Sequence, residues 1–163
     1  MRIIGIDPGK TGWWCLLDTE TREARAKPIR WTDGGIVILD FPNDIDAVYL
    51  EKIHVNSKFM PSSSSFNFGK SIGQIEYATK DYAVVQVAPK TWQKQCLIGI
   101  DEKIENKMRS RAGFSRLNPE HKDLKLSHDF TDSFHIACFG VYRCGHNAIG
   151  GWKWTEIGAK FKT

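Results

Sequence analysis

The chain has 163 residues, of which 41% are hydrophobic and 26% charged, and its formal net charge is +4 at neutral pH. This length favours one domain with an ordinary core, and the composition is that of a soluble globular protein. No apolar run reaches the roughly 18–20 residues that span a bilayer. The four cysteines lack a short paired spacing, and no secretory signal precedes them. We therefore expect a soluble cytoplasmic protein with free thiols, and a charge that permits a polyanionic partner without requiring one.

The first residues predict a β-hairpin with an acid at its rim. Residues 3–6 form a short apolar run of high β propensity that ends at Asp7. Residues 8–12 (Pro-Gly-Lys-Thr-Gly) are typical of a tight turn, and residues 13–17 form a second apolar run. An acid at the end of a central strand, beside such a turn, is well placed to hold a cation against a phosphate. Taken alone, an Asp in this setting more often does no more than begin a turn, so the acids further along the chain decide its role.

The next stretch has a weaker pattern. We expect a polar loop over residues 19–27, then the edge of a third strand, with residues 29–31 as strand. Residues 33–35 (Asp-Gly-Gly) are a strong turn signal. Residues 36–39 fit either a strand or a short helical turn, and the choice between strand and helix for residues 33–46 stays open.

A second buried strand is expected over residues 47–53. It repeats the pattern of the first strand, because its apolar run leads to an acid, Glu51. Residues 56–67 follow as a loop, and the serine run at residues 62–65 indicates that this loop is mobile.

A helix is expected over residues 66–80, where apolar residues recur near helical spacing. Gly69 and Gly73 lie one turn apart in it. Because glycine costs about 1 kcal/mol in a helix, this spacing suggests a face that packs closely against another backbone. Residues 83–87 then predict a strand that Pro89 stops.

Two helices are expected over residues 91–98 and 102–111, followed by a basic loop over residues 112–125. We expect residues 150–163 to form a tail after a Gly-Gly hinge. This leaves residues 1–149 as the folded domain.

Residues 127–143 show the best helical pattern in the chain. Ser127 is suited to cap the helix, and an apolar stripe runs along one side. The members of this stripe are Phe130, Phe134, Ala137, Cys138 and Val141. Asp129, Asp132 and His135 lie on the opposite side at a spacing of three residues. For this helix read alone, a solvated acidic face is the simpler interpretation.

Taken together, the acids predict a metal site. Asp7 and Glu51 end two buried strands, and Asp129 and Asp132 share the first turn of a late helix. If that helix crosses the rim of the sheet, four carboxylates converge, and their repulsion requires cations between them. Oxygen ligands of this kind suit Mg²⁺ or Mn²⁺ rather than Zn²⁺. Two such ions about 4 Å apart can hydrolyse a phosphodiester.

The chain resembles the RuvC-type Holliday-junction resolvases of the ribonuclease H-like superfamily. The resemblance covers residues 1–143 and rests on several segments in the family's order. These are residues 5–12, residues 49–53, residues 68–74, residues 94–103 and residues 129–137. It implies an α/β ribonuclease H-like fold, in which a central mixed sheet of about five strands is flanked by helices. It also implies a structure-selective endonuclease that nicks two strands of a four-way DNA junction symmetrically, as a homodimer joined through the helix over residues 66–80.

The resemblance further implies roles for individual residues. The catalytic and metal-binding acids would be Asp7, Glu51, Asp129 and Asp132, with two Mg²⁺ or Mn²⁺ ions and with Lys103 as a catalytic cation. Contacts to DNA would come from Lys10, His54, Lys58, Lys94 and Lys103. The expected setting is the cytoplasm of a bacterial or phage-infected cell, or an organelle or viral factory in a eukaryote.

Some features depart from the family, and alternatives stay open. The segment before residue 47 is too broken for the family's first long helix, and the loop with the serine run is longer. A ribonuclease H-like nuclease for another substrate, such as a flap, branched DNA or an RNA–DNA hybrid, is the main alternative. A non-catalytic DNA-binding module of this fold and an actin-like phosphate-binding domain are less favoured. A zinc site at His135, Cys138, Cys144 and His146 matches no common ligand spacing, so buried thiols are preferred.

Overall fold

The structure is a computed structural model that describes residues 1–9, 11–52, 62–147 and 150–157. Its strands are β1 (Arg2–Asp7), β2 (Trp13–Asp18), β3 (Glu23–Pro28), β4 (Arg30–Trp31), β5 (Val37–Ile38), β6 (Ala47–Glu51), β7 (Val84–Val87) and β8 (Lys153–Ile157). Its helices are α1 (Ser62–Ala78), α2 (Pro89–Cys96), α3 (Asn106–Leu117) and α4 (His128–Arg143), with a short 3₁₀ turn at Pro119–His121.

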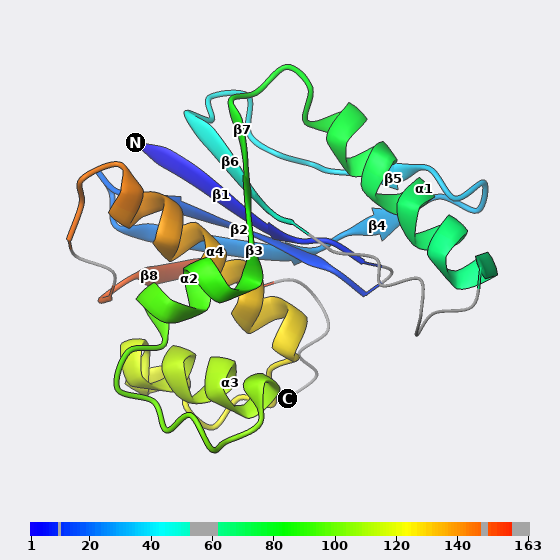
Figure 1. The fold of residues 1–163 in the computed structure, drawn as a ribbon. Helices are drawn as coiled ribbons and strands as arrows, with labels where there is room; N and C mark the ends of the chain where they lie inside the picture. Colours follow the sequence, from blue (N-terminus) through cyan, green and yellow to red (C-terminus); the bar gives the residue numbers. More distant parts are fainter. Residues whose placement is uncertain (10, 53–61, 148–149, 158–163) are drawn as a thin grey trace.

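Six strands form one mixed sheet in the order β7-β6-β1-β2-β3-β8. The first three strands of the chain are antiparallel neighbours, whereas β6 runs parallel to β1, β7 parallel to β6 and β8 parallel to β3. Helix α4 crosses one face, with α2 and α3 beside it, and α1 lies on the other side (Figure 1). The expected α/β architecture with a central mixed sheet is confirmed, with six strands instead of about five.

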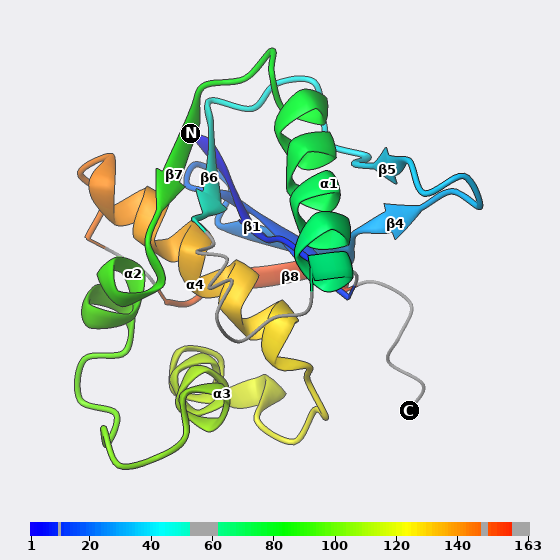
Figure 2. The same ribbon diagram turned by 45° about the vertical axis from the view of Figure 1, so that its right-hand side comes forward.

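Two separate cores follow from the alternation of side chains along the strands. On the α4 side, Ile3 and Leu17 pack with the apolar residues of that helix. On the α1 side, Ile4 and Leu16 pack with Ile75 of α1. The turned view in Figure 2 shows α1 and α4 lying on opposite sides of the central strands. Strand β1 therefore lies between a core on the α4 side and a core on the α1 side.

Helix α4 is the central element of the larger core. Ser127 caps it by accepting a hydrogen bond from the Phe130 amide at 3.2 Å, as expected. The whole predicted apolar stripe is fully buried. His135 is also fully buried, which corrects the expectation of a polar side, because α2 and α3 pack on that flank of the helix.

Two segments differ from expectation near the N-terminal half, and a choice left open by the sequence is decided. Part of the expected polar loop over residues 19–27 belongs to β3, because Ala24 and Ala26 alternate into the core while charged neighbours face outward. Strands β4 and β5 pair as a small second sheet, so residues 37–38 are strand. The serine run begins α1 instead of forming a mobile loop.

Two further segments differ near the C-terminal half. Helix α3 continues to Leu117, well into the expected basic loop, and buries Phe114 against α4. Residues 153–157 belong to the main sheet as β8 rather than to a separate tail. Trp154 of that strand packs its ring on Phe130 and Phe134, and this aromatic contact explains the pairing. Among the described helices, none is long and apolar enough to cross a membrane.

Candidate active site

The acids predicted from the sequence come from three elements. Asp7 is the last residue of β1, and Glu51 is the last residue of β6. Because β6 runs parallel to β1 as its neighbour, both strands end at the same edge of the sheet. Asp129 and Asp132 lie in the first turns of α4, whose contacts with β1 are the most extensive between any two elements of the described chain.

The hairpin turn sets the position of Asp7. The amide of Gly12 donates to the carbonyl of Gly9 at 3.1 Å, which closes the turn. A Cβ atom on Gly12 would overlap the carbonyl oxygen of Asp7, so only glycine allows this close return of the chain. The turn therefore holds the backbone of Asp7 at the rim of the sheet.

Asp7 is a buried acid whose pKa depends on the three other acids. Residue Asp7 is only 9% exposed. Burial raises its pKa well above the usual value, and the charges of Glu51, Asp132 and Asp129 raise it further, in that order. All three other acids therefore act on the one buried carboxyl group at the end of β1.

The pKa of Asp132 is also affected by neighbouring acids. Burial raises its pKa to about 7, and the charges of Glu51 and Asp129 act in the same direction. The hydroxyl of Ser110 and the ammonium group of Lys107 oppose this shift, since both favour the charged carboxylate. Both residues belong to α3, and the Ser110 hydroxyl donates to Thr131 Oγ1 of α4 at 2.8 Å.

Glu51 is held by a tryptophan. The indole Nε1 of Trp92 donates to Glu51 Oε1 at 2.8 Å. Burial raises the pKa of Glu51, and this hydrogen bond acts against the shift by favouring the carboxylate. On α4, His128 Nε2 lies 2.9 Å from Asp129 Oδ1. Glu51 and Asp129 therefore each have a polar side chain beside the carboxylate, Trp92 and His128 respectively.

The donor set fits a hard divalent cation. All four groups are carboxylates, and oxygen donors with several negative charges are what Mg²⁺ and Mn²⁺ prefer. Among the described residues, no group of three or more His, Cys, Asp or Glu side chains is already arranged to hold a metal ion. The other acids raise the pKa of Asp7 and of Asp132, but the four carboxylates would have to draw closer to share an ion.

Of the basic residues expected to contact DNA, only Lys94 and Lys103 lie in the described part of the chain. Lys94 on α2 and Lys103 before α3 are both exposed, and neither acts on the pKa of the carboxylates. Lys10, His54 and Lys58 lie outside the described residues. Lys107 was not singled out from the sequence. It lies within the helix expected over residues 102–111, but nothing in the sequence distinguishes it from neighbouring lysines.

A basic pocket of about 480 Å³ lies between α2 and α3. It is lined by Lys90, Gln93, Lys94, Leu97, Ile98, Gly99, Glu102 and Arg109. Three cations thus face one carboxylate, and within the described part of the chain none of the three forms an ion pair. Such a pocket is suited to an anionic group rather than to a metal ion.

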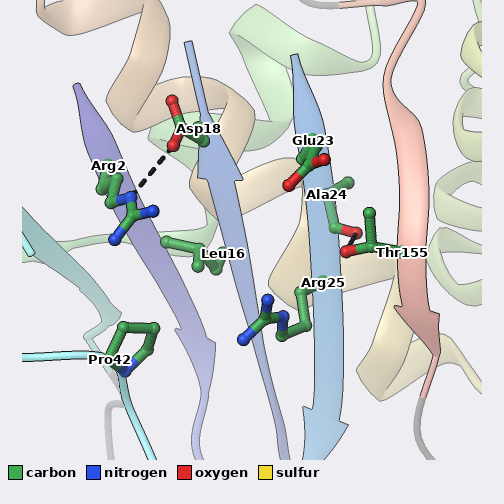
Figure 3. Close-up of a pocket in the computed structure, with 8 residues that line it drawn as sticks. All are labelled: Arg2, Leu16, Asp18, Glu23, Ala24, Arg25, Pro42 and Thr155. Atoms are coloured by element: carbon green, nitrogen blue, oxygen red, sulfur yellow. Dashed lines mark hydrogen bonds and ion pairs between the residues drawn. The ribbon is translucent and has the colours of Figure 1, made fainter. Parts of the chain in front are cut away.

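A second, smaller pocket of about 90 Å³ lies over β1, β2 and β3, on the face of the sheet opposite α4 (Figure 3). Arg2 Nε donates to Asp18 Oδ2 at 2.9 Å beside it, and Arg25 and Glu23 lie along its other wall. Arg2 and Asp18 pair at the end of the β1–β2 ladder that is opposite to Asp7. The charges of this pocket therefore balance locally, at a distance from the acidic site.

Comparison with known proteins supports the fold. No protein-family model and no curated protein matches the chain. Among solved structures, RuvC of T. thermophilus in complex with a Holliday junction substrate matches with a TM-score of 0.51 and 17% identity, covering 89% of this chain and 96% of that one. A second Thermus thermophilus RuvC structure (TM-score 0.48, 18% identity, 89% and 97% covered) and the yeast mitochondrial Holliday junction resolvase (0.47, 12%, 83% and 75%) also match. The chain has the ribonuclease H-like fold.

Proposed function

We propose that this protein is a metal-dependent endonuclease that resolves four-way DNA junctions. One observation carries the proposal: Asp7 and Glu51 end two neighbouring parallel strands at one edge of the sheet, where the charges of Glu51, Asp132 and Asp129 all raise the pKa of Asp7. Such a cluster is costly to the fold unless it binds cations. The substrate class is suggested by the Thermus protein of the same fold, which is described in complex with a Holliday junction.

In this proposal Asp7, Glu51, Asp129 and Asp132 would hold two Mg²⁺ or Mn²⁺ ions. Bound ions of this type activate a water molecule and stabilise the leaving oxygen of a phosphodiester. Lys107 would stabilise negative charge on the scissile phosphate, since its ammonium group already acts on Asp132. The catalytic role expected for Lys103 stays a prediction, which a comparison of cleavage rates for the two lysines tests.

The basic pocket between α2 and α3 would bind the DNA backbone next to the cleavage site. Lys94, expected from the sequence to contact DNA, lines this pocket together with Lys90 and Arg109. Helix α2 contributes Lys90 and Lys94 to this pocket and also carries Trp92, whose indole donates to Glu51 in the acidic site. Affinity for a polyanion comes mainly from such phosphate contacts.

We further propose a homodimer through α1, which would allow two strands to be cut symmetrically. Within the described residues, a Cβ atom on Gly69 or Gly73 would meet nothing within 4 Å, so this face of α1 is open. Phe66 and Tyr77 on the same helix are 72% and 71% exposed. Glycines beside exposed aromatic rings are suited to a close contact between two copies of a helix.

The decisive experiment is a nuclease assay with Mg²⁺ on a mobile four-way junction, beside duplex, flap and RNA–DNA hybrid substrates. We expect paired nicks in the junction and little cleavage of the other three. Equal cleavage of all four would refute the resolvase proposal and favour a general ribonuclease H-like nuclease. Absence of any cleavage, with DNA binding retained, would favour the non-catalytic alternative.

A further inference from the structure

A buried indole connects the elements that carry the acids. Trp92 of α2 is 1% exposed, and its Nε1–H donates to Glu51 Oε1 at 2.8 Å. Its ring stacks on the imidazole of His135 in α4, with centroids 6.1 Å apart and planes inclined by 10°. His135 in turn is held by the carbonyl of Ser110 in α3, 2.9 Å from its Nε2. The direction of the indole N–H is therefore set by the helices that bear the rest of the site.

The hydrogen bond from Trp92 restrains Glu51 against its own flexibility and against repulsion from the other acids. Its side chain has more rotatable bonds than that of an aspartate, and its charge and those of Asp7 and Asp132 repel one another. A hydrogen bond from an N–H group to a carboxylate is one of the stronger hydrogen bonds in proteins. The side chain of Glu51 is thus fixed by a contact that the acids themselves do not supply.

We propose that Trp92 is a positioning residue for metal binding, which holds Glu51 Oε1 and leaves Oε2 as the oxygen that binds the cation. Groups that orient metal ligands in this way raise metal affinity without touching the metal. The inference rests on the proposed function in one respect: the cation is taken to be bound by these carboxylates.

The test is Mn²⁺ binding to the full-length protein without DNA, measured by isothermal titration calorimetry. Trp92→Phe keeps an aromatic ring beside His135 but removes the N–H donor. We expect Mn²⁺ to bind about 10- to 100-fold more weakly to this variant. Binding at wild-type affinity would overturn the inference.

Trp154→Phe is the matched control. Trp154 also donates an indole hydrogen bond, to Asn118 Oδ1 at 2.9 Å, and it also packs against α4. Trp154→Phe should leave Mn²⁺ affinity unchanged, even if thermal unfolding shows that it destabilises the protein as much as Trp92→Phe does. If both variants bind Mn²⁺ equally weakly, the effect of Trp92 is general destabilisation and the inference is wrong.

A double variant tests whether Trp92 acts through Glu51. In a Glu51→Gln background, Trp92→Phe should cause no further loss of Mn²⁺ affinity, because the ligand that it orients has been replaced. A further loss of tenfold or more would overturn the inference. Wild-type protein that binds Mn²⁺ but cuts no junction would refute the proposed function alone, whereas wild-type protein that binds no Mn²⁺ would refute both.

Discussion

Gly5 of β1 lies directly beneath Ala137 of α4, so close that a Cβ atom on Gly5 would overlap the Ala137 backbone. Glycine at this position allows the helix to rest on the strand itself instead of on a layer of side chains. Two residues further along β1 stands Asp7, and the N-terminal turns of α4 carry Asp129 and Asp132. The close contact at Gly5 is therefore what brings these acids within reach of one another.

We expect Gly5→Ala to destabilise the protein by about 1–3 kcal/mol or more, because the added methyl group forces α4 away from the sheet. Cleavage should fall as well, since the acids on α4 move with the helix. Urea unfolding measures the first effect. Gly34→Ala is the control: a Cβ there would make only an ordinary contact, 3.7 Å from Thr32 Oγ1. Equal stability of the two variants would contradict the close contact.

We expect Asp7→Asn, Glu51→Gln, Asp129→Asn and Asp132→Asn each to abolish cleavage while junction binding is retained. Metal ligands act on the chemistry, whereas affinity comes mainly from cationic contacts to phosphate. In EDTA, Asp132→Asn should also be more stable than wild type at pH 8, because it removes a repelled charge from a buried position. Wild-type cleavage by Asp132→Asn would remove α4 from the active site.

Lys107 and Lys94 should behave differently when each is changed to alanine. Lys107→Ala should lower the single-turnover rate at saturating DNA by about tenfold or more, because it removes charge stabilisation at the phosphate. Lys94→Ala should chiefly weaken binding and reduce the salt dependence of binding by about one phosphate contact. Lys103→Ala serves as the comparison for rate. A larger rate loss in Lys103→Ala than in Lys107→Ala would restore the role first suggested by the sequence.

We expect sedimentation to show a dimer at micromolar concentration, and Gly73→Leu to shift it towards monomer. A leucine on the open face of α1 overpacks the proposed contact, at a typical cost of about 1–3 kcal/mol. Gly34→Leu, in the turn between β4 and β5, should leave the dimer intact. A wild-type monomer that still cuts both strands of a junction would count against this interface.

His135 should make the fold sensitive to acid. Burial lowers its pKa from 6.5 to about 4, and Arg116 acts in the same direction, whereas the hydrogen bond that His135 donates to the Ser110 carbonyl opposes the shift. In the unfolded chain His135 is therefore protonated below about pH 6.5, whereas in the folded protein it stays neutral down to about pH 4. This residue alone lowers the free energy of unfolding by up to about 3 kcal/mol over that range.

The check is urea unfolding of wild type and His135→Gln between pH 7 and 4. The buried carboxylates titrate in the opposite direction, but they are present in both proteins, so the difference between the two isolates the histidine. The stability gap between wild type and variant should shrink as the pH falls. A constant gap would contradict a neutral buried imidazole.

The sequence by itself determined the local elements and the acids that end them. Continuous apolar runs predict β1 up to Asp7 and the strand that carries Glu51, although that strand ends at Glu51 instead of residue 53. The periodicity and cap of α4 identify its buried stripe and its paired acids. These features depend on neighbours in the chain, so they can be read from a short window.

Only the tertiary structure decided which distant residues complete the site. Trp92 donates to Glu51 because α2 packs on α4, and the charge of Lys107 on α3 affects the pKa of Asp132. No local pattern distinguishes either residue from others of its type. The same holds for β8, which joins the sheet because Trp154 packs on the rings of α4. Contacts between residues far apart in the chain depend on the shape of the assembled core, which a pattern of neighbours does not contain.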